Sequence, residues 1–267
     1  MSGPLTKLLR NPRRYVPVAR KAMLGKLSGL FKRASFHLQA QMDIHPSSRW
    51  FPGSEIVART GGFFLRGDGC VREICDLEAH DSVRRDMLIL LLRTLTERNV
   101  AGALAELGVY QGLTAKLIHY YAPERRLYLF DTFAGFTARG AQAEAQHTGF
   151  HTTSSKFADT SLERVKAYVR AKNSNVSFHP GFFPDSVPPG LERERFAFVH
   201  LDADLYEPTL AGLEFFFPRM ERGGIIAVHD YNAWVGARAA VDRFFAARSE
   251  LPIPMPDKSG SVVIVKQ

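Results

Sequence analysis

The sequence has little cysteine and no apolar run long enough to cross a membrane. Its two cysteines, Cys70 and Cys75, are too few for a disulfide framework and wrongly spaced for a zinc site. The longest apolar run near the middle, Met87 to Leu92, is far shorter than the roughly 20 residues of a membrane span. The N-terminus shows no apolar stretch typical of a secretory signal. We therefore expect a cytoplasmic protein with reduced thiols.

Acidic residues are absent from positions 1–33, which contain nine Lys and Arg residues. The formal net charge of +8 therefore comes from this segment, because the rest of the chain has 26 basic residues against 27 acidic ones. A nucleic-acid-binding domain would carry a basic face on the folded domain itself. We expect no nucleic-acid partner.

The basic segment has an amphipathic pattern. Met23, Leu27, Leu30 and Phe31 are spaced for one side of a helix, with Lys and Arg between them. Such a helix can lie on an anionic membrane, which would place the protein at the inner membrane surface. It can equally pack on its own core or on a second subunit, and we favour packing and expect a homo-oligomer. We interpret residues 1–75 as this arm with an irregular extension, and residues 76–267 as one folded domain.

Short apolar runs alternate with helical stretches from about Asp76 onward, beginning with a helix that starts after Asp81 or Ser82. The predicted strands are "GALAELGV", "RLYLFD", "NVSFHP", "RFAFVHLD" and "GGIIAVHD", followed by a final hairpin. This alternation predicts an α/β fold: a doubly wound, mainly parallel, seven-stranded sheet with helices on both faces, a C-terminal antiparallel hairpin and an N-terminal helical extension. Ligands of such folds bind outside the carboxyl ends of the strands.

The loop after the first strand has glycines and an acidic residue in a suggestive order. Glu106, Gly108 and Gly112 are spaced as E-x-G-x-x-x-G, and Asp131 ends the next strand. Gly108 would allow a tight turn, Gly112 a close approach to a ligand, and Asp131 hydrogen bonds from ribose hydroxyls. The pattern G-x-G-x-x-G is absent, which disfavours a nicotinamide enzyme. The alternative is a plain strand–helix turn in which Asp131 is an N-cap.

Two further predicted strands end in carboxylates, Asp202 and Asp230. The helix between them is a short crossover, so we expect neighbouring strands about 4.8 Å apart. Carboxylates at their ends could then share a cation or a substrate hydroxyl. Unpaired, their repulsion would raise one pKa.

Other polar residues near these strand ends have structural interpretations. Asp204 with Glu207 resembles a capping box at the start of the crossover helix. His200 is expected to be a core histidine rather than a ligand. The setting of His147 and His151, among Gly and Thr, indicates a loop that covers the substrate and binds no metal.

Five segments resemble, in this order, the macrocin O-methyltransferase (TylF-type) family of class I methyltransferases. They are "AELGVYQGLTAKLI", "LYLFDTFAGF", "FADTSLERVKAYV", "FHPGFFPDSVP" and "FVHLDADLYEPTLAGLEFFFPRMERGGIIAVHDY". The resemblance covers about Asp81 to Phe245 and implies methylation of a sugar hydroxyl, on a glycosylated metabolite, a polysaccharide or a glycolipid, from S-adenosylmethionine. The residues that it places at the cofactor are Glu106, Gly108, Tyr110, Gly112, Asp131, Thr132 and Phe182.

The same resemblance implies a divalent metal, usually Mg²⁺, bound by Asp202 and Asp230. Many relatives have a second carboxylate just before the latter position, where this chain has His229. An oxygen-only magnesium site would lose one ligand, whereas histidine could recruit Mn²⁺ or act as the base. We expect Asp202, His229 and Asp230 to bind the metal and Asp202 or His229 to take the proton. The alternatives are a metal-independent methyltransferase with His229 as base, and a non-catalytic protein that docks through its arm.

Overall fold

The computed structural model describes residues 81–170 and 175–267, together with Leu27 and Phe31, which are helical. The chain divides into two units, Met1–Cys75 and Asp76–Gln267, and the elements below belong to the second. The predictions for the basic arm and the irregular extension therefore lie outside the described residues, apart from those two positions. No helix in the described part of the chain combines the length and the apolar character that a membrane span requires.

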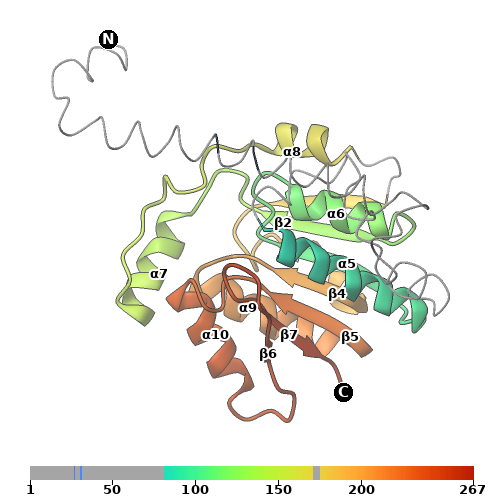
Figure 1. The fold of residues 1–267 in the computed structure, drawn as a ribbon. Coiled ribbons are helices and arrows are strands. Elements are labelled where there is room, and N and C mark those ends of the chain that lie inside the picture. Colours follow the sequence, from blue (N-terminus) through green and yellow to red (C-terminus); the bar gives the residue numbers. More distant parts are fainter. Residues whose placement is uncertain (1–26, 28–30, 32–80, 171–174) are drawn as a thin grey trace, which may run out of the picture. The chain divides into compact units, whose positions relative to one another are not determined.

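The domain is built on a seven-stranded sheet with the strand order β3-β2-β1-β4-β5-β7-β6 (Figure 1). The first five strands in this order, from β3 through β2, β1 and β4 to β5, run parallel. Strand β7 pairs antiparallel with β5, and β6 pairs antiparallel with β7. The predicted parallel sheet with a closing hairpin is confirmed. The strands are β1 (Ala103–Leu107), β2 (Leu127–Asp131), β3 (Val176–Pro180), β4 (Phe196–Leu201), β5 (Met220–Val228), β6 (Ile253–Pro254) and β7 (Val262–Val265).

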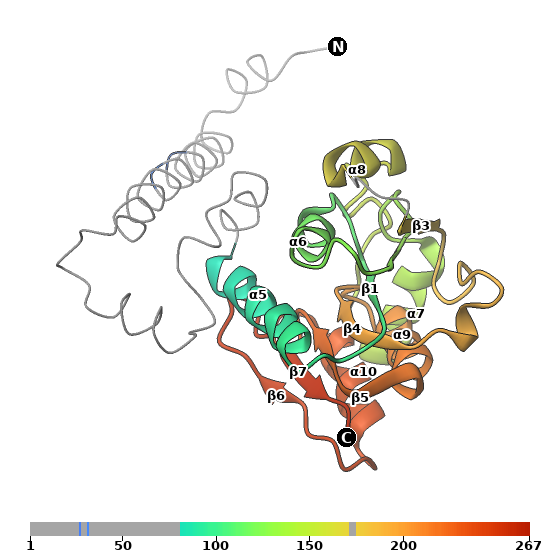
Figure 2. The same ribbon diagram turned by 90° about the vertical axis from the view of Figure 1, so that its right-hand side faces the viewer.

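Helices cover both faces of the sheet, as the alternating pattern predicts. Figure 2 shows α5 (Ser82–Glu97) and α6 (Leu113–Tyr121) on one side and α9 (Tyr206–Phe216) and α10 (Val235–Phe245) on the other. Helix α8 (Leu162–Val169) contacts α6, and α7 (Ala138–Thr148) contacts α9 and α10. Two short 3-10 helices, Leu191–Arg193 and Phe217–Arg219, connect elements of the sheet.

The central strands form the core because they are covered on both faces. Every residue of β4 is buried, and this explains its continuous apolar run. Helix α9 lies very close to the sheet, since a Cβ at Gly212 would come within 2.9 Å of Leu107. This packing holds the carboxyl ends of β1, β2, β4 and β5 along one edge of the sheet.

Helix α7 is absent from the elements predicted by periodicity. Its sequence, "ARGAQAEAQHT", has no apolar stripe, and the helix is stabilised by polar contacts instead. Thr137 caps it by accepting a hydrogen bond from the amide of Gly140 at 2.9 Å. His147 lies in this helix and stacks on Tyr206, with 4.5 Å between ring centroids. The prediction that His147 lies in a loop was therefore wrong, whereas His151 does follow the helix in a loop.

Candidate active site

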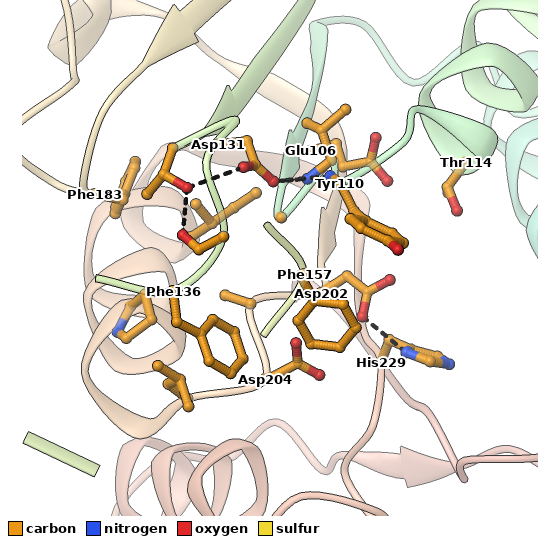
Figure 3. A pocket seen from close by; sticks show the side chains of 18 of the residues that line it. Glu106, Tyr110, Thr114, Asp131, Phe136, Phe157, Phe183, Asp202, Asp204 and His229 are labelled. Carbon is orange, nitrogen blue, oxygen red and sulfur yellow. Dashed lines mark hydrogen bonds and ion pairs between the residues drawn. The ribbon is translucent and has the colours of Figure 1, made fainter. Parts of the chain in front are cut away.

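A cavity of about 380 Å³ opens at the carboxyl ends of the central strands (Figure 3). Its volume falls within the range of small-molecule pockets. The loops after β1, β2, β4 and β5 line it, together with residues 135–137 and Phe157. Of the residues predicted from the sequence, the structure brings these into one lining: Glu106, Gly108, Tyr110, Asp131, Thr132, Phe182, Asp202, His229 and Asp230.

Asp131 is bound by backbone amides at one end of the cavity. Its Oδ2 accepts hydrogen bonds from the amides of Val109 at 2.7 Å and Tyr110 at 2.8 Å, and its Oδ1 accepts one from Phe133 at 2.6 Å. The carboxylate thus fixes the shape of the loop after β1. It caps no helix, since the next helix begins at Ala138. A role for Asp131 at a ribose stays a prediction.

Gly108 and Gly112, the two glycines of the loop after β1, allow different close contacts. Gly108 has φ of +90°, and a Cβ there would lie 2.0 Å from the carbonyl oxygen of Asp202. The glycine therefore lets the end of β1 pass directly beside the end of β4. A Cβ at Gly112 would instead meet Val165 at 3.0 Å and Val169 at 3.2 Å on α8. The structure places Gly112 in helix packing, outside the cavity lining, in place of the predicted approach to a ligand.

Glu106 and His200 form a buried pair beneath the cavity. Glu106 Oε1 lies 3.0 Å from His200 Nδ1, and both side chains are 1% exposed. Burial, reinforced by the nearby Asp202, raises the pKa of Glu106 well above 4.5. Burial lowers the pKa of His200 to about 3, so both shifts favour a neutral pair with its proton on the carboxyl group. His200 is a core histidine, as predicted.

Aromatic rings that the sequence patterns did not indicate form one wall of the cavity. Phe157 packs edge-on against Tyr110 at 5.1 Å and against Phe136 at 5.3 Å. The amide of Phe136 donates to the carbonyl of Lys156 at 3.2 Å, which ties the two segments together. Both segments lie outside any strand or helix of the described chain, so no periodicity could reveal them.

Two predicted cofactor residues support the same region. Thr132 Oγ1 donates to the carbonyl of Gly135 at 2.6 Å, which shapes the turn after β2. The ring of Phe182 lies under the guanidinium of Arg139, 4.4 Å from its centre. The structure therefore gives each of them a local contact as well as a place in the lining.

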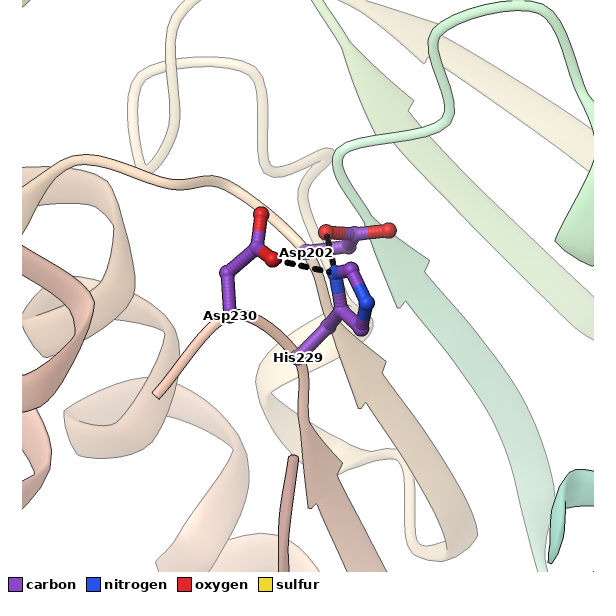
Figure 4. Close-up of side chains that lie close together, drawn as sticks. All are labelled: Asp202, His229 and Asp230. Atoms are coloured by element: carbon purple, nitrogen blue, oxygen red, sulfur yellow. Dashed lines mark hydrogen bonds and ion pairs between the residues drawn. The ribbon is translucent and has the colours of Figure 1, made fainter. Parts of the chain in front are cut away.

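Asp202, His229 and Asp230 form a cluster at the opposite end of the cavity (Figure 4). β4 and β5 are parallel neighbours, with Leu201 opposite Val228, so the residues that follow them meet as predicted. His229 Nδ1 lies 2.8 Å from Asp202 Oδ1 and 3.2 Å from Asp230 Oδ1. One imidazole nitrogen thus faces both carboxylates.

Arg84, from the first turn of α5, completes this cluster and was not predicted. Its Nη1 lies 3.3 Å from Asp202 Oδ2 and 2.8 Å from His229 Nε2, and its Nη2 donates to Thr114 at 3.3 Å. The sequence offers no signal for it, because a single arginine in a helix resembles any solvated side chain.

The charges of the cluster depend on one another. Burial alone would raise the pKa of Asp202, but His229 and Arg84 lower it well below its usual range. Burial lowers the pKa of His229 and the two carboxylates raise it, while the charge of Arg84 again lowers it. A guanidinium has no lone pair to offer, so Arg84 at 2.8 Å requires an unprotonated Nε2. This contact requires a neutral ring whose Nδ1–H donates to the carboxylates, and a second proton on the ring would displace Arg84.

Asp204 lies in the cavity lining and caps no helix. Helix α9 begins at Tyr206, whose amide donates to Glu144 Oε2 at 2.7 Å, so a carboxylate from α7 takes the expected capping role. Burial and a hydrogen bond with Asp230 raise the pKa of Asp204 well above 3.8. The predicted capping box of Asp204 with Glu207 was wrong, because the side chain of Asp204 is buried beside Asp230 and the N-cap position belongs to Leu205.

The cluster has a donor set that only partly suits a divalent cation. One ligand atom from each of Asp202, His229 and Asp230 lies within 4.8 Å of the others. Mg²⁺ prefers an octahedral set of oxygen atoms, and the imidazole nitrogen better suits Mn²⁺. The carboxylates already bind His229, and Arg84 adds a positive charge beside Asp202. This arrangement does not fit a bound cation unless Arg84 moves.

Comparison with known proteins identifies relatives of this chain. The model of the family "Macrocin-O-methyltransferase (TylF)" matches residues 81–263. A tetracenomycin 4'-O-methyltransferase of Streptomyces olivaceus, which acts on a dimethoxyrhamnosyl derivative, is 33% identical over 158 residues, or 55% of this chain and 60% of that protein. Demethyldecarbamoylnovobiocin O-methyltransferase of Streptomyces niveus is 30% identical over the same shares of the two chains. The chain thus spans about 60% of the length of these curated relatives.

Two solved structures have similar folds. The O-methyltransferase NovP is 26% identical, with a TM-score of 0.58, over 69% of this chain and 79% of that one. The calicheamicin methyltransferase CalS11 is 20% identical, with a TM-score of 0.56, over 88% of this chain and 91% of that one. The likeness to CalS11 supports the fold alone.

Proposed function

Because the chain belongs to the macrocin O-methyltransferase family, we propose that it transfers a methyl group from S-adenosylmethionine to a hydroxyl group of a sugar. The observation that carries this proposal is the cavity that joins Asp131 at one end to the Asp202–His229 pair at the other. A cofactor at the first end and an acceptor at the second would meet within a single lining.

The groups at the first end suit the proposed cofactor. Glu106 Oε2 is buried and has no hydrogen-bond partner among the described residues, although Glu106 lines the cavity. A buried acceptor of this kind is stabilised when a ligand donates a hydrogen bond to it. S-adenosylmethionine offers such donors in its ammonium group and ribose hydroxyls, and when bound it supplies a methyl group that needs no further activation.

The second end suits removal of a proton from the acceptor. Both ring nitrogens of His229 are engaged, one with the carboxylates and one with Arg84. The carboxylate of Asp202 lines the cavity, and each of its oxygens keeps a free lone pair beside its bond to His229 or Arg84, so it is the base in this proposal. His229 orients that carboxylate by donating to Oδ1 at 2.8 Å.

The proposed acceptor is a sugar on a small glycosylated molecule. The names of three relatives refer to tetracenomycin, novobiocin and mycinamicin derivatives, and one of these names specifies a rhamnosyl group. Polysaccharides and glycolipids are the competing acceptor classes. A screen of all three classes decides between them.

A second form of the proposal includes Mg²⁺ or Mn²⁺ held by Asp202, His229 and Asp230. The close spacing of their ligand atoms favours it, and the position of Arg84 opposes it. A cytoplasmic location, membrane contact through residues 1–33 and a homo-oligomer rest on the sequence alone. Vesicle sedimentation with and without residues 1–33, and light scattering of the full chain, would test the last two.

The test of methyl transfer uses full-length protein, isotopically labelled S-adenosylmethionine and a panel of glycosides, with product detected by mass spectrometry. We expect a labelled methyl group on a sugar hydroxyl of at least one glycoside. Glu124→Gln is a matched control, because Glu124 is an exposed carboxylate at the opposite edge of the sheet, before β2. Labelled cofactor that never binds the protein would contradict the proposal.

A further inference from the structure

Arg84 occupies the side of the acidic cluster that a cation would need. Its Nη1 lies between Asp202 Oδ2 at 3.3 Å and His229 Nε2 at 2.8 Å. Its side chain is 12% exposed, and Nη2 donates to Thr114 at 3.3 Å. One guanidinium therefore contacts Asp202 after β4, His229 after β5 and Thr114 in α6.

The backbone that carries Arg84 is fixed to the same end of the domain. Asp81 caps α5, and its Oδ1 accepts from the amides of Val83 and Arg84 at 3.1 Å each. The other oxygen of Asp81 accepts from the amide of Lys258 at 2.7 Å. The first turn of α5 is thus attached to the loop before β7, and Arg84 is held in place from both its backbone and its side chain.

A divalent cation and Arg84 in this position exclude each other. A cation bound to Nδ1 of His229 would leave the hydrogen of the neutral ring on Nε2. That hydrogen would point at Arg84 Nη1, itself a donor, 2.8 Å away. The cation would also lie beside a fixed positive charge, where mutual repulsion is large at partly buried sites.

We propose that Arg84 is the resident cation of this cluster: its guanidinium takes the place of a divalent metal and keeps the site free of one. The catalytic part of this inference rests on the proposed methyl transfer. In that reaction Arg84 is a positioning residue, which orients the Asp202 carboxylate by donating to its Oδ2 at 3.3 Å. The metal-binding part is independent of any activity.

Mn²⁺ binding to full-length protein tests the metal-binding part directly, with the signal of free Mn²⁺ followed by electron paramagnetic resonance. We expect the wild type to bind no stoichiometric Mn²⁺ at millimolar concentration. Arg84→Gln should bind one Mn²⁺ at least about 100-fold more tightly, because a positive charge has left the site. The added change Asp230→Asn should abolish that gain, whereas Arg98→Gln, an exposed arginine at the other end of α5, should behave as the wild type.

Methyl transfer in the presence of a chelator tests the catalytic part. We expect the wild type to keep its rate, Arg84→Gln to lose most of it, and Arg84→Lys to recover part of it because one positive charge remains. Tight, stoichiometric Mn²⁺ binding by the wild type would overturn the inference, whether or not Arg84→Gln folds. A chelator that abolishes the wild-type rate would also overturn it. Absence of S-adenosylmethionine binding to every variant would instead overturn the proposed function and leave the Mn²⁺ result intact.

Discussion

Asp131 ends β2 and Asp202 directly follows β4, and both line the same cavity, yet they are bound in different ways. Backbone amides of Val109, Tyr110 and Phe133 hold Asp131. Side chains hold Asp202, with His229 at Oδ1 and Arg84 at Oδ2. A carboxylate bound by the backbone defines the shape of a loop, whereas one bound by side chains can exchange partners during a reaction. We infer that the Asp131 end is preformed for binding and that the Asp202 end carries the chemistry.

Replacement of the proposed base should have the largest effect, on the rate of methyl transfer and not on cofactor affinity. In Asp202→Asn the side chain keeps its shape and loses its ability to take a proton, so the rate of methyl transfer should fall about 1,000-fold. The affinity for S-adenosylmethionine should change little. Single-turnover kinetics and calorimetry on the same sample measure both quantities, and a large loss of affinity with an unchanged rate would contradict the division.

Asp131→Ala should have the converse effect. Three backbone amides lose their acceptor, so the loop after β1 should lose its shape and the affinity for S-adenosylmethionine should fall about 100-fold. Asp131→Asn retains an oxygen for the amides and should lose less. Calorimetric titration of both variants measures the difference. Equal affinities in Asp131→Ala and the wild type would show that this end binds no cofactor.

The buried Glu106–His200 pair predicts how stability depends on pH. The pKa of His200 falls from 6.5 to about 3 on folding, so its contribution is lost as pH falls below 6.5. The pKa of Glu106 is raised above 4.5 on folding. Its contribution to the free energy of unfolding is therefore greatest below pH 4.5 and is lost as the pH rises. The two changes cancel between about 4.5 and 6.5, where the pair should contribute most to the free energy of unfolding.

Glu106→Gln tests this expectation. Above pH 6.5 the wild type should lose about 1.4 kcal/mol of unfolding free energy per pH unit that the variant does not lose, until Glu106 itself ionises. Urea denaturation at a series of pH values gives both curves. Parallel curves from pH 6.5 to 8.5 would show that the carboxyl group is ionised in the folded protein.

Gly112→Ala should have the smallest effect. Its φ of +85° and the contact with Val165 on α8 should reduce the free energy of unfolding by about 1–2 kcal/mol. Because Gly112 lies outside the cavity lining, cofactor affinity at a temperature where the variant is folded should match the wild type. Thermal denaturation measures the change in stability, and calorimetry measures cofactor affinity. A loss of affinity without a loss of stability would show that Gly112 contributes to cofactor binding.

Much of the fold and of the acidic cluster can be predicted from local sequence. Apolar runs that alternate with helices predict the sheet, and the short crossover between β4 and β5 predicts that Asp202 meets Asp230. Arg84 could not be predicted, because its place depends on how the first turn of α5 lies across the ends of these strands. The role of Asp204 was predicted wrongly for a related reason. The local pattern D-x-x-E matches a helix cap, but the position of Asp204 depends on Asp230, which is distant in the sequence.

The measurement that most directly tests the proposed division is calorimetric titration of S-adenosylmethionine into full-length wild type and Asp202→Asn, with a chelator present throughout. We expect one molecule bound per chain, with closely similar affinity in the two proteins. A large loss of affinity in Asp202→Asn would contradict the division, and failure of the wild type to bind S-adenosylmethionine would contradict the assignment of the cavity as a methyl-transfer site.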